Sequence, residues 1–339
     1  MTETPTPAEA PTGGGRPTRV SVSVIVPAFN EAAVITETLA SLTEHLRGIE
    51  DRYAWEVVVV DDGSDDGTHD LALRFAAGCP GVRVLSHPQN FMLGQALRTA
   101  FNSCESDYLV VIDCDLSYGP EHIDRLLDSI VATKAKVVIA SPYMQGGSCT
   151  GVPFLRYLAS RVANKILSVA ASGRLTTLTG MVRAYDRRFV AALNLKAMGV
   201  EVNTEIIYKA QVLRAVVVEI PAHLDWTVIK GIPRRSTVRL ASGTVRSLLS
   251  AFIFRPFMFF ILPGLLLGAT GTGLIVWSWA DRAAGGADLH VAGEIGLVLG
   301  AGLCSIGIMA LQAKRYFEEL FHLGTSILRE LRERRPPQL

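Results

Sequence analysis

A run of residues without any charge, 257–280, constrains the fold of this chain more than any other part of its sequence. It reads FMFFILPGLLLGATGTGLIVWSWA, and as a helix it is long enough to cross a hydrocarbon core of roughly 30 Å. A second uncharged run, 295–313, lies between Glu294 and Lys314. We predict two membrane-spanning helices joined by the polar loop 281–290. The alternative is a pair of buried helices in a soluble domain, which the first run disfavours because it is apolar on all sides.

The segments that flank the two runs are basic. Segment 229–256 contains several arginines and no acid, and 314–339 is rich in arginine. By the positive-inside rule, both flanks lie in the cytoplasm and only the tip of the hairpin 257–313 lies outside. The sequence therefore predicts an integral membrane protein, of the plasma membrane if the source is bacterial. Within the tail, 314–332 is amphipathic, and we expect it to lie on the membrane surface rather than to bind a partner.

The N-terminal segment 1–18 lacks the apolar core of a signal peptide and is rich in Pro, Thr and Gly, as in a disordered tail. We therefore expect 19–228 to form a cytoplasmic domain. The five cysteines are scattered without C-x-x-C spacing, which indicates neither a disulfide framework nor a zinc site. A net charge of +1 gives no indication of a nucleic-acid partner, and none is expected.

The cytoplasmic part alternates short apolar strands with helices. This alternation predicts an α/β domain with a mostly parallel sheet, covered on both faces, whose ligand crevice lies beyond the carboxyl ends of the strands. The predicted strands are rich in Val and Ile and begin with VSVSVIVP, WEVVVVDD, VRVLS, YLVVIDCD and KVVIASP.

Polar clusters follow four of these strands: PAFNE, DDGSDDGT, HPQN and DCDLSY. Any one of them could be a turn, since Asp, Gly, Asn and Ser dominate ordinary loops. Four at one edge of a sheet predict a site. The sequence has no G-x-G-x-x-G after the first strand and no G-x-x-x-x-G-K-[ST], which argues against a dinucleotide-binding fold and a P-loop.

Two acids, Asp113 and Asp115, stand one residue apart at the end of a buried apolar run. If the strand continues to this point, both side chains lie on one face, because side chains alternate along a strand. Two carboxylates that close repel each other unless a cation or a proton lies between them. The alternative is that the pair merely caps the helix that follows.

Four segments together resemble the family 2 inverting glycosyltransferases with the glycosyltransferase-A fold: VSVIVPAFNEAAVITETLASL, EVVVVDDGSDDGT, DYLVVIDCDLSYGPEHI and TGMVRAYDRRFV. With the two C-terminal spans, the chain is most similar to the polyprenyl-phosphate glycosyltransferases of the dolichol-phosphate mannose synthase group. The resemblance covers roughly 20–239.

The resemblance implies roles for the residues at the strand ends. PAFNE matches the P-x-Y-N-E of the family, and DDGS matches the acid pair that contacts base and ribose. The implied nucleotide-binding residues are Pro27, Phe29, Glu31, Asp61 and Asp62. The D-x-D of the family matches Asp113 and Asp115, which implies a divalent cation, Mg²⁺ or Mn²⁺, on the diphosphate of the donor.

Further matches imply an acceptor side. Glu205, in EVNTEIIYKA, matches a segment with an active-site acid, although from the residues alone a solvated helix face is the preferred interpretation. Arg183 in RAYDRR is implied to lie near the acceptor. Arg234 and Arg235 in PRRST stand where members carry a basic patch, and they could bind a lipid phosphate.

The sequence departs from the family at three motifs. Met92 and Leu93 replace a glycine and a lysine of N-x-G-K-G-x-A, Pro142 replaces the arginine of S-R-Y, and Thr237 replaces the lysine of R-S-K. These changes put details of the donor and acceptor sites in doubt.

The implied activity is transfer of one sugar, with inversion, from a GDP- or UDP-linked donor to a polyprenyl phosphate at the cytoplasmic membrane face. One alternative is a non-catalytic, membrane-tethered module that binds a nucleotide sugar. A polysaccharide synthase of the same fold is the weaker alternative, because such enzymes usually carry Q-x-x-R-W and more spans. The sequence carries no indication of the sugar, the polyprenyl length or the oligomeric state.

Overall fold

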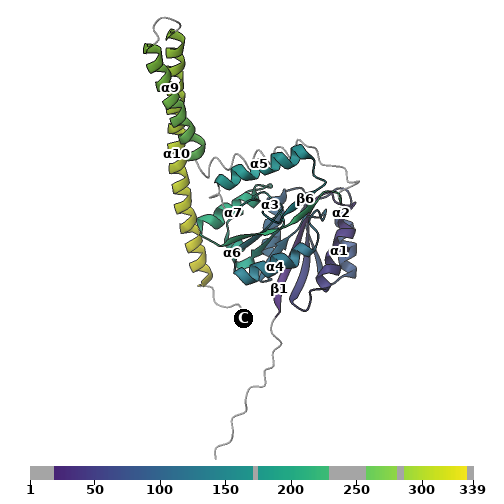
Figure 1. Ribbon diagram of the computed structural model, residues 1–339. Coiled ribbons are helices and arrows are strands. Elements are labelled where there is room, and N and C mark those ends of the chain that lie inside the picture. Colours follow the sequence, from purple (N-terminus) through teal and green to yellow (C-terminus); the bar gives the residue numbers. More distant parts are fainter. Residues whose placement is uncertain (1–18, 171–174, 229–256, 281–285, 334–339) are drawn as a thin grey trace, which may run out of the picture.

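A computed structural model describes residues 19–170, 175–228, 257–280 and 286–333. A seven-stranded sheet covered by helices forms the body of the molecule, and a hairpin of two long helices projects from it (Figure 1). The strand order is β3-β2-β1-β4-β7-β5-β8. Segments 1–18 and 229–256 lie outside the described residues, and so do Arg234, Arg235 and Thr237.

The first half of the sheet is parallel, as the sequence predicts. Its strands are β1 Val20–Ala28, β2 Tyr53–Asp61, β3 Val82–Ser86 and β4 Tyr108–Val111. In the pairing of β1 with its two neighbours, Val24 lies opposite Val57 and Val110. The helices between them are α1 Ile35–Arg47, α2 Thr68–Gly78, α3 Leu93–Ser103 and α4 Glu121–Thr133.

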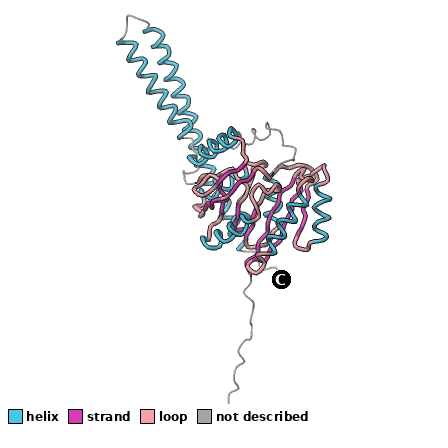
Figure 2. Tube along the Cα trace, turned by 45° about the vertical axis from the view of Figure 1, so that its right-hand side comes forward, coloured by secondary structure: helices cyan, strands magenta, loops and turns pink. Residues whose placement is uncertain are grey.

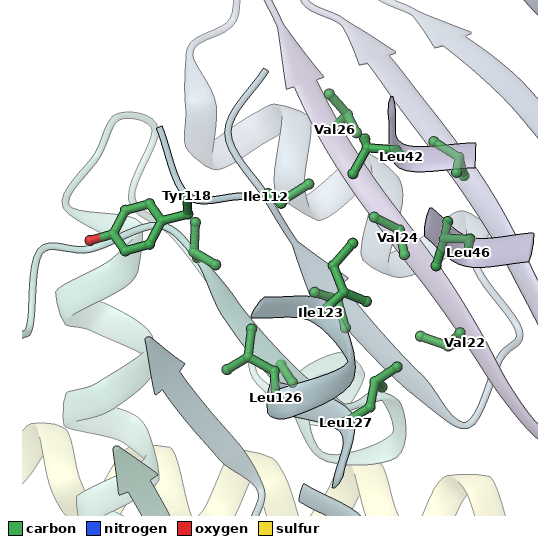
Figure 3. Packing of buried hydrophobic residues seen from close by; sticks show 14 of the residues in the cluster. Val22, Val24, Val26, Leu42, Leu46, Ile112, Tyr118, Ile123, Leu126 and Leu127 are labelled. Atoms are coloured by element: carbon green, nitrogen blue, oxygen red, sulfur yellow. The ribbon is translucent and has the colours of Figure 1, made fainter. Parts of the chain in front are cut away.

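Alternating residues of β1 bury against opposite helix layers. One layer joins Val22, Val24 and Val26 to α1 and α4 through Leu42 and Leu126 (Figure 3). The other face, which includes Ile25, packs against α3, α6 (Arg187–Ala192) and α7 (Val202–Val212). Burial on both faces is the reason that the strands are nearly continuous Val and Ile.

The second half of the sheet contains strands that the sequence did not predict. β7 Arg183–Asp186 runs antiparallel between β4 and β5 Val137–Ser141, and β8 Val217–Pro221 pairs in parallel with β5. A small sheet pairs β6 Ser148–Thr150 with β9 His223–Asp225.

The C-terminal hairpin consists of η1 Phe257–Ile261, α9 Leu262–Ala280 and α10 Gly286–Glu333. Two helices, Phe259–Trp279 and Ala287–Phe317, are long and apolar enough to cross a membrane, and only 11% of the most apolar stretch of each is buried. Such exposure contradicts the alternative of buried core helices.

Small residues let the two helices of the hairpin approach closely. A Cβ on Gly264 would lie 2.7 Å from the Gly300 carbonyl oxygen, and a Cβ on Gly271 would lie 2.6 Å from that of Gly293.

The helix α10 differs from the sequence prediction in two respects. It begins at Gly286, so the predicted polar loop 281–290 is partly helical. It also continues without a break through 314–332, where we predicted a separate helix on the membrane surface. There the ring of Phe317 stacks on that of Tyr208 from α7, with centroids 6.3 Å apart. An amphipathic pattern suits a protein surface as well as a lipid surface, and part of α10 packs against the domain (Figure 1).

Candidate active site

The loops that follow β1 and β2 are joined into one unit by hydrogen bonds. The amide of Asn30 donates to Ser64 Oγ (2.9 Å), the amide of Asp65 donates to Asn30 Oδ1 (3.0 Å), and the amide of Glu31 donates to Thr68 Oγ1 (2.8 Å). Asn30 has a φ of 57°, a left-handed conformation that asparagine tolerates better than most residues. The structure therefore brings PAFNE and DDGSDDGT together at the carboxyl edge of the sheet.

Asp61 and Asp62, predicted to contact the nucleotide, are both buried. Asp61 Oδ1 accepts the amide of Ser64 (3.3 Å), and its other oxygen lies 3.6 Å from Nδ1 of His69. Asp62 Oδ1 accepts the amide of Phe91 (2.9 Å). These bonds hold both carboxylates at the carboxyl end of β2.

His87 is a member of this site that sequence reasoning did not single out. Its Nδ1 lies 2.7 Å from Asp62 Oδ1, and its Nε2 lies 2.8 Å from Thr99 Oγ1. A Cβ on Gly63, whose φ is +72°, would lie 2.4 Å from the backbone of Gln89. The loop after β3 is thus anchored by the DDG segment, and the motif HPQN was the sequence signal for it.

Asp113 and Asp115 lie beyond the end of β4, which stops at Val111. The pKa of Asp113 is raised to about 8, first by burial and then by the charges of Asp115 and Glu31. Glu31, from the loop after β1, is therefore close enough to interact with Asp113. Three acids converge here, where repulsion favours a proton or a cation.

The turn that holds the two acids is not a helix cap. Asp115 Oδ1 accepts the amide of Ser117 (2.9 Å), and Leu116 has a left-handed φ of 48°. The helix α4 begins only at Glu121, and among the described residues no side chain caps its first turn. The capping alternative is therefore wrong.

The donors at this edge fit a hard divalent cation. The described residues contain no group of three His, Cys, Asp or Glu side chains arranged to hold a metal by themselves. Mg²⁺ and similar ions are commonly bound by one or two carboxylates, with substrate phosphates and water completing the shell. Burial and the charges of Asp115 and Glu31 raise the pKa of Asp113, and a nearby cation would act against this shift. Asp113 and Asp115 suit a cation that arrives with a phosphate ligand.

Arg183, which we expected near the acceptor, is fully buried instead. Its Nη1 donates to the carbonyl of Asn203 (2.8 Å) and its Nη2 to that of Leu178 (2.6 Å). Burial lowers the pKa of the guanidinium. In this arrangement Arg183 ties β7 to the start of α7 and offers no exposed surface to a phosphate.

Glu205 is partly buried, whereas the residue pattern alone favoured a solvated helix face. It accepts the amides of Lys196 (2.9 Å) and Ala197 (2.8 Å) and forms a 2.6 Å ion pair with the buried Lys209. It therefore organises the loop before α7. That loop contacts the start of α3, where the amide of Gly94 donates to the carbonyl of Met198 (2.6 Å), beside the departures Met92 and Leu93.

Tyr118 and Tyr143 lie between the region of Asp113 and the helix α5. Burial raises the pKa of Tyr118, with further contributions from Asp113 and Tyr143 in the same direction. Tyr143, directly after Pro142, donates its hydroxyl to Ser160 Oγ of α5 (2.8 Å). The helix α5 spans Phe154–Ala170.

Glu219 of β8 is a second residue that the sequence analysis missed. Its carboxylate accepts the amides of Thr176 (2.8 Å) and Thr177 (2.7 Å). No sequence signal pointed to it, because β8 itself was not predicted. His122 is buried inside the fold, where its Nε2 accepts the amide of His223 (3.1 Å).

Solved structures share the fold of the domain. Glucosyl-3-phosphoglycerate synthase of Mycobacterium tuberculosis, in complex with Mn²⁺, UDP and glucosyl-3-phosphoglycerate, matches with a TM-score of 0.53 and 20% identity over 70% of this chain and 79% of that one. The same enzyme with Mg²⁺ and UDP matches equally, at 0.53 and 20% over the same shares. At this identity the likeness establishes a glycosyltransferase-A fold.

Curated relatives match at higher identity. Dolichol-phosphate mannosyltransferase of Pyrococcus furiosus is 29% identical over 60% of this chain and 56% of its own length. Glycosyltransferase AglD of Haloferax volcanii is 30% identical over 61% of this chain and 33% of its own length. Undecaprenyl-phosphate 4-deoxy-4-formamido-L-arabinose transferase of Aeromonas hydrophila is 29% identical over 51% of each. The chain thus spans between a third and just over half of each relative.

The family model of glycosyl transferase family 2 matches residues 23–193, about half of the chain. This match includes the loops that carry Glu31, Asp61, Asp62, Asp113 and Asp115. The fold, the acids at the carboxyl edge and the relatives agree with it, and the chain belongs to glycosyl transferase family 2.

Proposed function

We propose that this protein transfers one sugar, with inversion, from a nucleotide-diphosphate sugar to a polyprenyl phosphate at the cytoplasmic face of a membrane. The observation that carries the proposal is the position of Asp113 and Asp115 just beyond the carboxyl end of β4 in a family 2 fold, with Glu31 near enough to raise the pKa of Asp113. Relatives named for transfer to dolichyl or undecaprenyl phosphate support the acceptor class.

On the donor side, Asp113 and Asp115 would hold Mg²⁺ or Mn²⁺ together with the diphosphate. When bound there, the cation would supply positive charge to the departing nucleoside diphosphate. The joined loops after β1 and β2, with Pro27, Phe29 and Glu31, surround the nucleotide. Asp61 and Asp62 accept hydrogen bonds from base and ribose. UDP in the solved structures of similar fold supports UDP or a related nucleotide such as GDP.

On the acceptor side, the nucleophile is an oxygen of the lipid phosphate. This oxygen is ionised at neutral pH, so it needs little help from a general base. Positioning and charge neutralisation therefore provide the catalysis. Arg234 and Arg235 bind the phosphate, while Arg183 positions β7 and α7 through the carbonyls of Leu178 and Asn203.

The hairpin anchors the protein in the bilayer. Its two apolar helices support integral membrane insertion, and the basic flanks 229–256 and 314–339 support a cytoplasmic domain. The lipid phosphate then emerges on the same side as the donor.

A non-catalytic nucleotide-sugar-binding module is the second candidate. The observation that favours it is the set of departures Met92, Leu93 and Pro142. The acid cluster opposes it, because a module that only binds does not need to neutralise a leaving group.

A product assay separates the two candidates. Purified full-length protein in detergent is incubated with each labelled UDP- or GDP-sugar, a polyprenyl phosphate and Mg²⁺ or Mn²⁺. We expect label in the organic phase as a single lipid-linked sugar whose anomeric configuration is opposite to that of the donor. Nucleotide binding without any lipid-linked product across the whole panel would favour the binding module. Long polymer would favour a polysaccharide synthase.

A further inference from the structure

The helix α5 lies across the edge of the domain where the parallel strands end. In Figure 1 the chain enters β1 from the bottom, the strands run upward, and α5 covers the top. Its inner side is fixed to the domain through Tyr143, which bonds Ser160 Oγ, and through Asn164, whose Oδ1 accepts the amide of Leu178 (2.8 Å). Asp113 and Asp115 follow the carboxyl end of β4, so the acid cluster and α5 lie at the same edge of the sheet.

The outer face of α5 is an exposed apolar stripe. Its members lie at helical spacing i, i+1, i+4 and i+8, which places them on one side of the helix. They are Phe154 (73% exposed), Leu155 (80%), Leu158 (45%) and Val162 (49%). Contiguous apolar surface of this kind marks an interaction site.

The charges of α5 are all positive. The helix contains Arg156, Arg161 and Lys165 and no acid. Arg161 and Lys165 are exposed at the edge of the apolar stripe. Arg156 stacks on the ring of Trp226 at 4.2 Å, which fixes the first turn of α5 beside the end of the domain. An apolar stripe edged by cations is the composition of helices that lie in the surface of an anionic bilayer.

The candidate membrane hairpin leaves the domain on the same side. In Figures 1 and 2 the hairpin rises from the level of α5 and projects away from the domain beyond it. A bilayer that contains α9 and the first part of α10 therefore lies in front of the outer face of α5.

We propose that α5 is a second membrane contact, which lies in the lipid headgroup region with Phe154, Leu155, Leu158 and Val162 inserted toward the acyl chains. The occupant of this face is a lipid bilayer. The contact holds the acid cluster of Asp113 at the depth where a lipid phosphate is found. This last consequence rests on the proposed function, whereas the membrane contact itself does not.

A depth measurement tests the contact without any need for turnover. The background is full-length protein with the two partly exposed cysteines removed, Cys149→Ser and Cys304→Ala. A nitroxide spin label is attached to this protein through Leu158→Cys. The matched control is Leu73→Cys on α2, which has nearly the same exposure, 46%. The protein is placed in phosphatidylcholine nanodiscs with phosphatidylglycerol. We expect the label at 158 to be relaxed mainly by oxygen, which concentrates in lipid, and the label at 73 mainly by a water-soluble nickel chelate.

Two results would overturn the proposal. A label at 158 that the nickel chelate reaches as easily as the label at 73 means that the face is in water. A label at 158 that neither oxygen nor the nickel chelate reaches means that a protein covers the face. A spectrum broadened by the label of a neighbouring molecule means that another copy of the chain covers it.

A second variant links the contact to the acceptor. Leu155→Glu with Leu158→Glu should raise KM for polyprenyl phosphate in nanodiscs by roughly tenfold and leave KM for the nucleotide sugar unchanged, because only the lipid approaches through this face. Leu73→Glu should change neither constant. Circular dichroism and the melting temperature report whether the double variant is folded.

The two experiments keep the proposals apart. Lipid-phase relaxation at 158 in a protein without transferase activity would reject the proposed function and retain the contact. Transfer at the wild-type KM by the double variant would reject the contact and retain the function.

Discussion

Asp113, a proposed ligand of the cation, destabilises the fold when it is ionised. Its pKa of about 8 lies well above the value near 4 of an unfolded chain. Between those two values the folded state holds a proton that the unfolded state releases, so stability falls as pH rises from about 4 to about 8. A cation between the acids removes this penalty.

Asp113→Asn tests this linkage. Without divalent cations, the variant should be more stable than the wild type at pH 8 by on the order of 1–3 kcal/mol, below the full linkage value because Asp113 is partly exposed. The difference should shrink toward pH 4, where both side chains are neutral. Thermal unfolding in detergent with a chelator measures it, and Asp70→Asn on the exposed side of α2 is the control. A difference that does not change with pH would contradict the assignment.

At the residue scale, the sequence predicted the position of the acids at the edge of the sheet, but not the burial of Arg183. Asp61, Asp62, Asp113 and Asp115 stand where apolar runs end, and parallel strands bring such ends to one edge. The burial of Arg183 was not predicted, because the four-residue strand RAYD has no apolar run to mark it as buried. Its two carbonyl partners, Leu178 and Asn203, come from separate parts of the chain that only the fold brings together.

At the element scale, periodicity predicted the parallel strands and the helices between them. It missed β7 and β8, and it made β4 too long, since Asp113 and Asp115 belong to a turn rather than to the strand. An antiparallel strand inserted between β4 and β5 depends on long-range pairing, which local pattern does not report.

Gly94 shows how closely elements approach around the donor side. A Cβ there would lie 2.1 Å from the carbonyl oxygen of Ala197, in the loop that Glu205 organises. Gly94→Ala should therefore lower the free energy of unfolding by about 1–3 kcal/mol, because α3 and this loop must separate. Gly78→Ala, where an added Cβ meets nothing within 4 Å, should be neutral or slightly stabilising.

Chemical denaturation of both glycine variants measures the difference. Equal stability of Gly94→Ala and Gly78→Ala would mean that the loop before α7 moves freely away from α3, and that Glu205 does not hold it in place.

At the scale of the whole molecule, one helix joins the membrane hairpin to the domain. The 48 residues of α10 extend about 72 Å at 1.5 Å per residue, more than twice the roughly 30 Å of a hydrocarbon core. Its C-terminal part therefore lies outside the core, where Phe317 contacts Tyr208 of α7. With α5 as a second contact, the domain is held against the bilayer at two places. The sequence predicted the spans from their composition, but not this continuity, because amphipathic patterns fit lipid and protein surfaces alike.

The central claim is that Asp113 and Asp115 bind a cation with the diphosphate of a sugar donor and thereby drive transfer to a lipid phosphate. Its most direct test is the rate of lipid-linked sugar formation by Asp115→Ala, against Asp70→Ala as control, at saturating Mn²⁺ or Mg²⁺. We predict that Asp115→Ala loses the activity while it remains folded and membrane-inserted, and that Asp70→Ala matches the wild type. Near-normal turnover by purified Asp115→Ala would contradict the claim.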